Sequence, residues 1–125
     1  MVRSTRDRGR AAEDLAAGWL EARGFEVLAR NHAIRGGEVD LVCREGETIC
    51  FVEVRSRASL AFGTPAESVD RAKARRVVLA AQDWAARHRA LHRQLRFDVV
   101  SVDWASGGAR LALFRGAFDA GRDAL

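Results

Sequence analysis

The strongest constraint on this sequence is a charged residue in the middle of an apolar run. Residues 48–55 indicate a β-strand that is nearly all apolar between Thr48 and Arg55, apart from Glu53. A strand of this composition is typical of the centre of a sheet, where both faces are covered. An unpaired carboxylate buried there costs several kcal/mol or has to become neutral. We therefore expect the fold to provide a partner for Glu53.

A predicted hairpin brings further charged side chains to the same place. Residues 38–44 indicate a strand, and Glu45-Gly46-Glu47 is typical of a tight turn that leads into the apolar strand. Side chains two apart on a strand share a face, so Arg55 lies on the same side as Glu53. The hairpin is therefore expected to bring two carboxylates, Asp40 and Glu53, together with a basic side chain.

Two carboxylates on neighbouring strands repel each other unless a cation lies between them. Mg²⁺ suits such a site because it prefers oxygen ligands and keeps several waters for a substrate phosphate. A metal so placed activates water and neutralises charge at phosphorus. The alternative is structural: Glu53 would form an ion pair with Arg55 or Arg57, and Asp40 a salt bridge near the turn. The spacing of these residues alone favours the structural alternative.

The rest of the chain predicts one α/β domain. Apolar residues recur at helical spacing in two segments, and three further segments indicate strands. The long connection through the second helix predicts that the strands before and after it are parallel. The expected order is helix, three antiparallel strands, helix and strand, a mixed sheet flanked by helices. The additional elements expected are a helix at 9–23, a strand at 25–30, a polar bend at 31–35, a helix at 66–92, a strand at 96–104 and a short strand at 110–114.

The expected domain organisation is a flexible basic N-terminus at residues 1–8, a single domain at 9–114 and a tail at 115–125. No apolar run is long enough to cross a membrane. The two cysteines, Cys43 and Cys50, lie inside apolar strands and indicate buried free thiols rather than a zinc site. Together these features predict a cytoplasmic protein without a membrane partner.

Basic residues dominate the charge, with a net charge of +4 and a pI near 10.3. Residues 73–96 carry seven basic side chains against one acid, and Lys73 is the only lysine of the chain. A basic stripe of this kind is typical of nucleic-acid binding. A solvated helix surface is an equally good explanation of the charge alone.

Several short motifs together resemble the YraN family of small bacterial proteins. The resemblance covers about residues 9–104 and implies an endonuclease-like protein of the PD-(D/E)xK fold, with a restriction-endonuclease-like core. The nearest characterised relatives in that fold are archaeal-type Holliday junction resolvases. The motifs are Gly9-Arg10-Ala11-Ala12-Glu13, Gly24-Phe25, Arg30-Asn31, Gly37-Glu38-Val39-Asp40-Leu41, Phe51-Val52-Glu53-Val54-Arg55-Ser56-Arg57, Lys73 and Arg96-Phe97-Asp98-Val99-Val100.

The resemblance implies a role for each site residue. Asp40 and Glu53 would bind Mg²⁺ or Mn²⁺ together with the backbone carbonyl of Val54. Glu13 would add a carboxylate from the first helix, either beside these ligands or at a second metal. Arg55 stands where the family motif has lysine; it can bind a phosphate bidentately but cannot accept a proton. The side chains expected to contact nucleic acid are Arg57, Lys73, Arg75 and Arg76.

The sequence thus predicts a metal-dependent endonuclease that binds branched or structured DNA and hydrolyses phosphodiester bonds. A nuclease for a two-fold symmetric junction would be a C2 homodimer. The alternative is a nucleic-acid-binding protein that keeps the nuclease fold but cleaves weakly or not at all because of Arg55. Lys73 is open to two interpretations: it replaces the motif lysine from the helix or, more simply, is a solvated helix residue.

Overall fold

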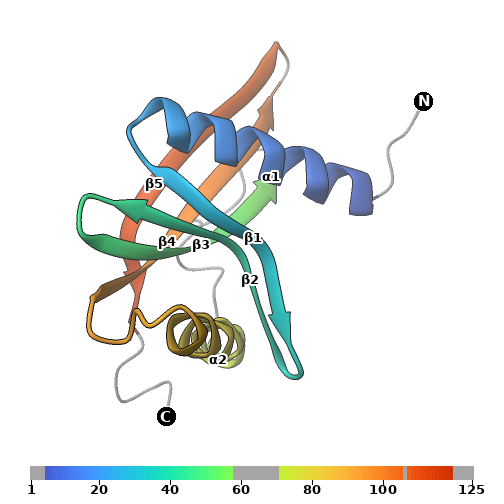
Figure 1. The fold of residues 1–125 in the computed structure, drawn as a ribbon. Helices are drawn as coiled ribbons and strands as arrows, with labels where there is room; N and C mark the ends of the chain where they lie inside the picture. Colours follow the sequence, from blue (N-terminus) through green and yellow to red (C-terminus); the bar gives the residue numbers. More distant parts are fainter. Residues whose placement is uncertain (1–4, 58–70, 106, 120–125) are drawn as a thin grey trace.

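The structure is a computed structural model that describes residues 5–57, 71–105 and 107–119. A five-stranded sheet with the order β1-β2-β3-β4-β5 carries one helix on each face (Figure 1). This is the α/β architecture that the sequence predicts, and it is compatible with a restriction-endonuclease-like core. The elements are α1 (Thr5–Ala22), β1 (Glu26–Ile34), β2 (Gly37–Glu45), β3 (Thr48–Arg57), α2 (Arg71–Arg87), β4 (Gln94–Ala105) and β5 (Gly108–Phe118).

The sheet is mixed, and β3 lies at its centre. β1, β2 and β3 form an antiparallel meander, β3 and β4 are parallel, and β5 returns antiparallel to β4. The predicted parallel pairing across the α2 connection is therefore confirmed. A strand with neighbours on both edges and a helix over each face is buried on all sides, which explains the apolar composition of β3.

Each face of the sheet has its own core. The α1 face packs alanines of the helix and Leu20 against Val52 and neighbouring strand residues. On the α2 face, Phe51 stacks on Phe97 with ring centroids 5.5 Å apart and meets Trp84 edge-on at 6.1 Å. Because side chains alternate along β3, Glu53 follows Phe51 on the α2 face. The fold therefore buries this carboxylate beneath α2.

The expected polar bend at 31–35 is wrong, because β1 continues to Ile34. Its pairing with β2 runs to Ile34 opposite Gly37, with one register shift between Val27 and Ala29. β1 is an edge strand, so its outward side chains can be polar without any loss of burial. The polar composition of this segment concealed the last residues of a strand that is nine residues long.

The two helices end in the same way but with different residues. Gly24 adopts a φ of 94° after α1, as expected for a glycine stop, and the N–H of Phe25 bonds the carbonyl of Leu20. After α2, Arg89 adopts a φ of 53° and the N–H of Ala90 bonds the carbonyl of Ala85 at 2.7 Å. The expected helix end at residue 92 is therefore too late. The residue with positive φ that follows a helix is usually glycine, but here it is Arg89, so the sequence carries no glycine signal for this helix end.

Two other limits also shift. α1 begins at Thr5, ahead of the expected helix start at residue 9, and β5 continues to Phe118, past the expected strand end at residue 114. The part of the predicted second helix at residues 66–70 lies outside the described residues. Within the described part of the chain, no helix is long and apolar enough to cross a membrane.

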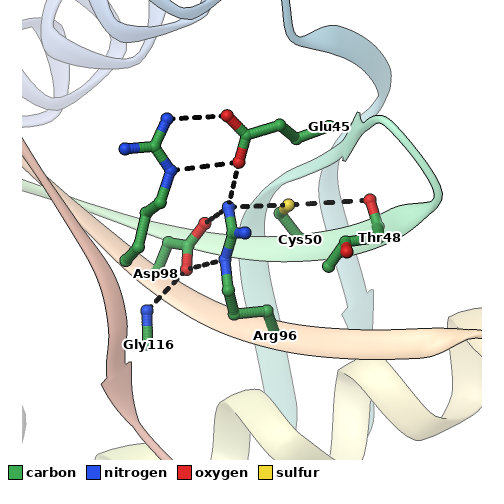
Figure 2. A network of polar contacts seen from close by, with 7 residues as sticks. Glu45, Thr48, Cys50, Arg96, Asp98 and Gly116 are labelled. Carbon is green, nitrogen blue, oxygen red and sulfur yellow. Dashed lines mark hydrogen bonds and ion pairs between the residues drawn. The ribbon is translucent and has the colours of Figure 1, made fainter.

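A network of charged side chains lies on the α1 face, where the β2–β3 turn meets β4 and β5 (Figure 2). Asp98 is fully buried and accepts hydrogen bonds from Nε and Nη2 of Arg96, at 2.8 and 2.9 Å, and from the Gly116 N–H at 2.9 Å. Glu45 accepts from Arg96 at 2.7 Å and from Arg115 at 2.6 and 3.0 Å. We call these residues the Arg96 network; it joins β2, β4 and β5.

Candidate functional site

The candidate site lies where β2 and β3 separate. Their pairing ends with Leu41 opposite Val52, so the next positions on the two strands are Asp40 and Glu53. β3 remains paired with β4 beyond this point. Asp40 accepts a hydrogen bond from the Val54 N–H through Oδ2, at 2.8 Å. The Asp40 carboxylate thus takes the place of the strand partner that Val54 loses, which fixes it beside Glu53.

Glu53 is buried without full compensation. It is 3% exposed, and its Oε1 lies 3.7 Å from the Lys73 amino group. Its Oε2 has no hydrogen-bond partner among the described residues. Burial, followed by the charge of the neighbouring Asp40, raises the pKa of the Glu53 carboxyl to about 8, while Lys73 and, less strongly, Arg55 oppose this. If both Asp40 and Glu53 are to be ionised at neutral pH, the site therefore needs a cation in addition to Lys73 and Arg55.

A cleft of about 390 Å³ opens above this pair of acids, between the sheet and α2. Gly37 allows the strand and the helix to approach: a Cβ at this position would lie 2.3 Å from the carbonyl oxygen of Arg76. The cleft has an acidic wall from the strands and a basic wall from the helix. Its described lining consists of Glu38, Asp40, Glu53, Ala72, Lys73, Arg76 and Val77.

Glu13 reaches the vicinity of Asp40 from α1. Its carboxyl is partly buried, and burial followed by the charge of Asp40 raises its pKa, against a hydrogen bond from Asn31. Nevertheless, no group of three or more Asp, Glu, His or Cys side chains converges at metal-binding distance in the part of the chain that the structure describes. The structure thus brings Asp40 and Glu53 together and leaves Glu13 near Asp40, outside a common ligand set.

The basic residues expected at the site separate into two groups. Lys73 and Arg76 line the cleft, whereas the exposed Arg75 and the partly buried Arg55 are not among its described lining residues. Lys73 is therefore more than a solvated helix residue, which was the simpler interpretation of the sequence. The side chain of Arg57 lies outside the described residues.

Sequence reasoning did not assign two polar features next to the cleft. Glu38 lines it; strand alternation already places Glu38 on the same side as Asp40, but the sequence analysis assigned it no role at the site. His32 on β1 lies 2.9 Å from Asp83 on α2, and Arg87 bonds the same carboxylate at 2.9 Å. These contacts hold the turn end of the β1–β2 hairpin against α2. No sequence pattern indicated this contact between residues so far apart in the chain.

The acid pair has the donor chemistry of a site for a hard divalent cation. Carboxylate oxygens are the preferred ligands of Mg²⁺ and Mn²⁺. One Asp40 oxygen is used by the Val54 N–H, and the buried Glu53 Oε2 has no donor among the described residues. A cation would satisfy that oxygen and remove the repulsion between the two acids. Water and substrate would have to complete its coordination.

Comparison with known proteins places the chain among similar sequences along most of its length. Residues 12–102 match the uncharacterised protein family UPF0102. A UPF0102 protein of Anaeromyxobacter sp. (strain Fw109-5) is 61% identical over 114 residues, which cover 91% of this chain and 86% of that protein. A UPF0102 protein of Beutenbergia cavernae is 49% identical, covering 86% and 92%. One of Pseudomonas aeruginosa (strain LESB58) is 44% identical, covering 94% and 96%. These three names state no activity.

Proposed function

The chain belongs to the UPF0102 (YraN) family, and we propose that it is a metal-dependent endonuclease that hydrolyses phosphodiester bonds in branched or structured DNA. The observation that carries the proposal is the buried acid pair. Asp40 and Glu53 meet where two strands separate, and one buried oxygen of Glu53 has no donor among the described residues. A purely structural carboxylate at this depth is normally hydrogen-bonded throughout.

The proposed reaction is the hydrolysis of a phosphodiester. The oxygen of water bonds to phosphorus, the bond from phosphorus to one ester oxygen breaks, and the departing oxygen receives a proton. A divalent cation bound by the acid pair would activate the water and neutralise charge at phosphorus. The Asp40 and Glu53 carboxylates would hold that cation, with the Val54 carbonyl as a further proposed ligand and Glu13 as an acid beside Asp40.

The cleft wall formed by α2 suits a phosphodiester substrate. Lys73 and Arg76 place positive charge opposite the acid pair, so a phosphate in the cleft would meet cations on both sides. Arg55 and Arg75 are proposed to contact the substrate backbone outside the cleft, and Arg57 is proposed as a further nucleic-acid contact. A C2 homodimer would present two such sites to a junction with two-fold symmetry.

Cleavage assays test this proposal directly. Four-way junction, single-stranded and duplex DNA are incubated with Mg²⁺, Mn²⁺ or chelator, using wild type, Asp40→Asn and Glu53→Gln. We expect cleavage that requires metal, is strongest on the junction, and falls at least ~100-fold in both variants. Asp14→Asn is the matched control, because Asp14 is an exposed acid next to Glu13 whose partner is Arg30. Its cleavage should equal that of wild type.

Calorimetry with Mn²⁺ tests the metal site separately. We expect wild-type binding that weakens at least ~10-fold in Asp40→Asn and Glu53→Gln, and less in Glu13→Gln. No detectable binding by wild type would contradict the proposed metal site. DNA binding without cleavage under any metal, unchanged in both variants, would instead support the alternative of a nucleic-acid-binding protein.

A further inference from the structure

Two basic side chains lie near Glu53, and they differ in their access to the cleft. Lys73 lines the cleft from α2, with its amino group 3.7 Å from the Glu53 carboxylate. Arg55 follows Glu53 on the same face of β3, but it is not among the described residues that line the cleft. The charge of Lys73 also opposes the raised pKa of Glu53 more strongly than that of Arg55 does. Of these two side chains, Lys73 is therefore the one that the cleft presents beside the acid pair.

The position of Lys73 follows from the buried stripe of α2. Val77 lies one turn after Lys73 and is buried, and Ala80 and Trp84 continue the stripe over the sheet. A residue four positions before Val77 shares its face, so the lysine stem is directed toward the sheet. Lys73 thus lies at the N-terminal end of the buried stripe, where β2 and β3 separate. The side chain is 43% exposed, which leaves its amino group accessible to a substrate.

We propose that Lys73 contacts the phosphate that is cleaved, binding a non-bridging oxygen with its ammonium group, and so supplies from α2 the cation that Arg55 does not supply from β3. This inference rests on the proposed nuclease function and adds a residue that touches the substrate. In the free protein the same ammonium group forms an ion pair with Glu53. Its flexible four-carbon stem allows it to move the short distance to a phosphate held over the acid pair.

The arrangement explains how the chain tolerates arginine at position 55. If the basic group of the site came from β3 and had to transfer a proton, arginine could not replace lysine there, because a guanidinium stays charged. When the cation comes from α2 instead, position 55 needs only a positive charge close to Glu53. Lys73 is also the only lysine in the chain, although the sequence uses arginine at nearly every other basic position.

The test compares single-turnover cleavage by wild type, Lys73→Met, Lys73→Arg and Arg55→Met. Arg71→Met is the matched control, since it removes one positive charge from the same end of α2. Arg71 is exposed, and a separation of two residues directs it to another side of the helix. Mn²⁺ affinity by calorimetry and the urea unfolding midpoint are measured for every variant. The affinity for labelled junction DNA is measured in chelator.

We expect Lys73→Met to lower the cleavage rate about 100-fold, as for the loss of one donor to a developing charge. Its Mn²⁺ affinity and unfolding midpoint should stay close to those of wild type, while its DNA affinity in chelator falls about 3- to 10-fold. Lys73→Arg should keep the rate within about 10-fold, because a guanidinium also binds phosphate. Arg55→Met should lose less than Lys73→Met, and Arg71→Met should be close to wild type.

Several results would overturn the inference. Lys73→Met that cleaves like Arg71→Met, or Arg55→Met that loses more than Lys73→Met, would remove Lys73 from the substrate contact while leaving the nuclease function intact. Lys73→Arg as inactive as Lys73→Met would show that a removable proton is needed, which contradicts a phosphate contact. Absence of cleavage by wild type itself would reject the proposed function together with this inference.

Discussion

Two buried acids on neighbouring strands of this sheet have opposite surroundings. Asp98 on β4 lies opposite Val52, one residue before Glu53 on β3, and both acids are almost inaccessible to solvent. Asp98 lies in the Arg96 network on the α1 face, where both of its oxygens accept hydrogen bonds (Figure 2). Glu53 lies on the α2 face beside another acid, with one oxygen that has no donor among the described residues. Burial alone therefore does not identify a functional carboxylate; incomplete compensation does.

The difference also appears in the ionisation of the two regions. In the Arg96 network, hydrogen bonds from Arg115 and Arg96, against some desolvation, lower the pKa of Glu45 to about 2. In the cleft, burial and Asp40 raise the pKa of Glu53 to about 8. The network stabilises its charges, whereas the cleft holds a carboxylate that destabilises the fold once it ionises. The first arrangement is suited to joining strands, and the second to binding a cation.

The largest expected change in stability follows from a substitution in the Arg96 network. Asp98→Ala removes the acceptor for Nε of the partly buried Arg96 and for the Gly116 N–H, and it leaves Glu45 as the remaining carboxylate partner of Arg96. We expect a loss of about 3–5 kcal/mol in the free energy of unfolding, measured by urea denaturation. The double variant Asp98→Leu with Arg96→Met should recover much of this loss, since no buried charge remains. A loss below about 1 kcal/mol for Asp98→Ala would show that the network contributes little.

In the cleft, removal of the buried acid is expected to stabilise the fold rather than destabilise it. The pKa of Glu53 is about 8 in the folded protein against an ordinary value of 4.5, so its contribution favours folding below pH 4.5 and is lost as pH rises through 8. Glutamine does not titrate. In chelator at pH 8–9, Glu53→Gln should therefore be more stable than wild type by about 1–3 kcal/mol. Addition of Mn²⁺ should stabilise wild type but not the variant.

Thermal unfolding followed from pH 5 to pH 9 distinguishes this from a general effect of pH. The stability difference between Glu53→Gln and wild type should grow across that range. If the variant were less stable than wild type throughout, Glu53 would be a structural residue like Asp98, and the contrast between the two regions would fail.

The smallest effect is expected at Glu45, at the edge of the Arg96 network. Its pKa is lowered from 4.5 to about 2, so it contributes stability above pH 4.5 that is lost as pH falls toward 2. Because solvent screens this partly exposed group, we expect a contribution of only about 1 kcal/mol. The difference in stability between wild type and Glu45→Gln should be present at pH 6 and vanish near pH 2. A constant difference would assign the effect to packing rather than charge.

Much of the fold could be predicted because local patterns and tertiary structure agree. The apolar run of β3, the turn before it and the amphipathic helices predicted the order of elements and the parallel pairing of β3 with β4. The errors occurred where local composition was misleading. Polar residues concealed the end of β1 because it lies at an edge, and Arg89 ended α2 in a conformation that usually requires glycine.

The site was predictable only in part, because local sequence patterns do not show which distant residues meet there. Strand alternation placed Glu38 and Asp40 on one side of their strand, and the resemblance to the YraN family implied Asp40 as the partner of Glu53. The position of Lys73 was not predictable, because a helix can present a residue to solvent or to a cleft with the same local pattern. The role of Asp98 was equally hidden: an acid alternating along a strand does not reveal which of its neighbours donate hydrogen bonds.

The sequence by itself determined the α/β architecture, the family and the presence of a buried acid that had to be compensated, since these follow from periodicity, motifs and the cost of burying charge. Tertiary structure alone decided which acid is compensated and which is not. That distinction depends on contacts between residues far apart in the chain. Asp98 has Gly116 and Arg96 as donors, while Glu53 has another acid and one lysine of α2.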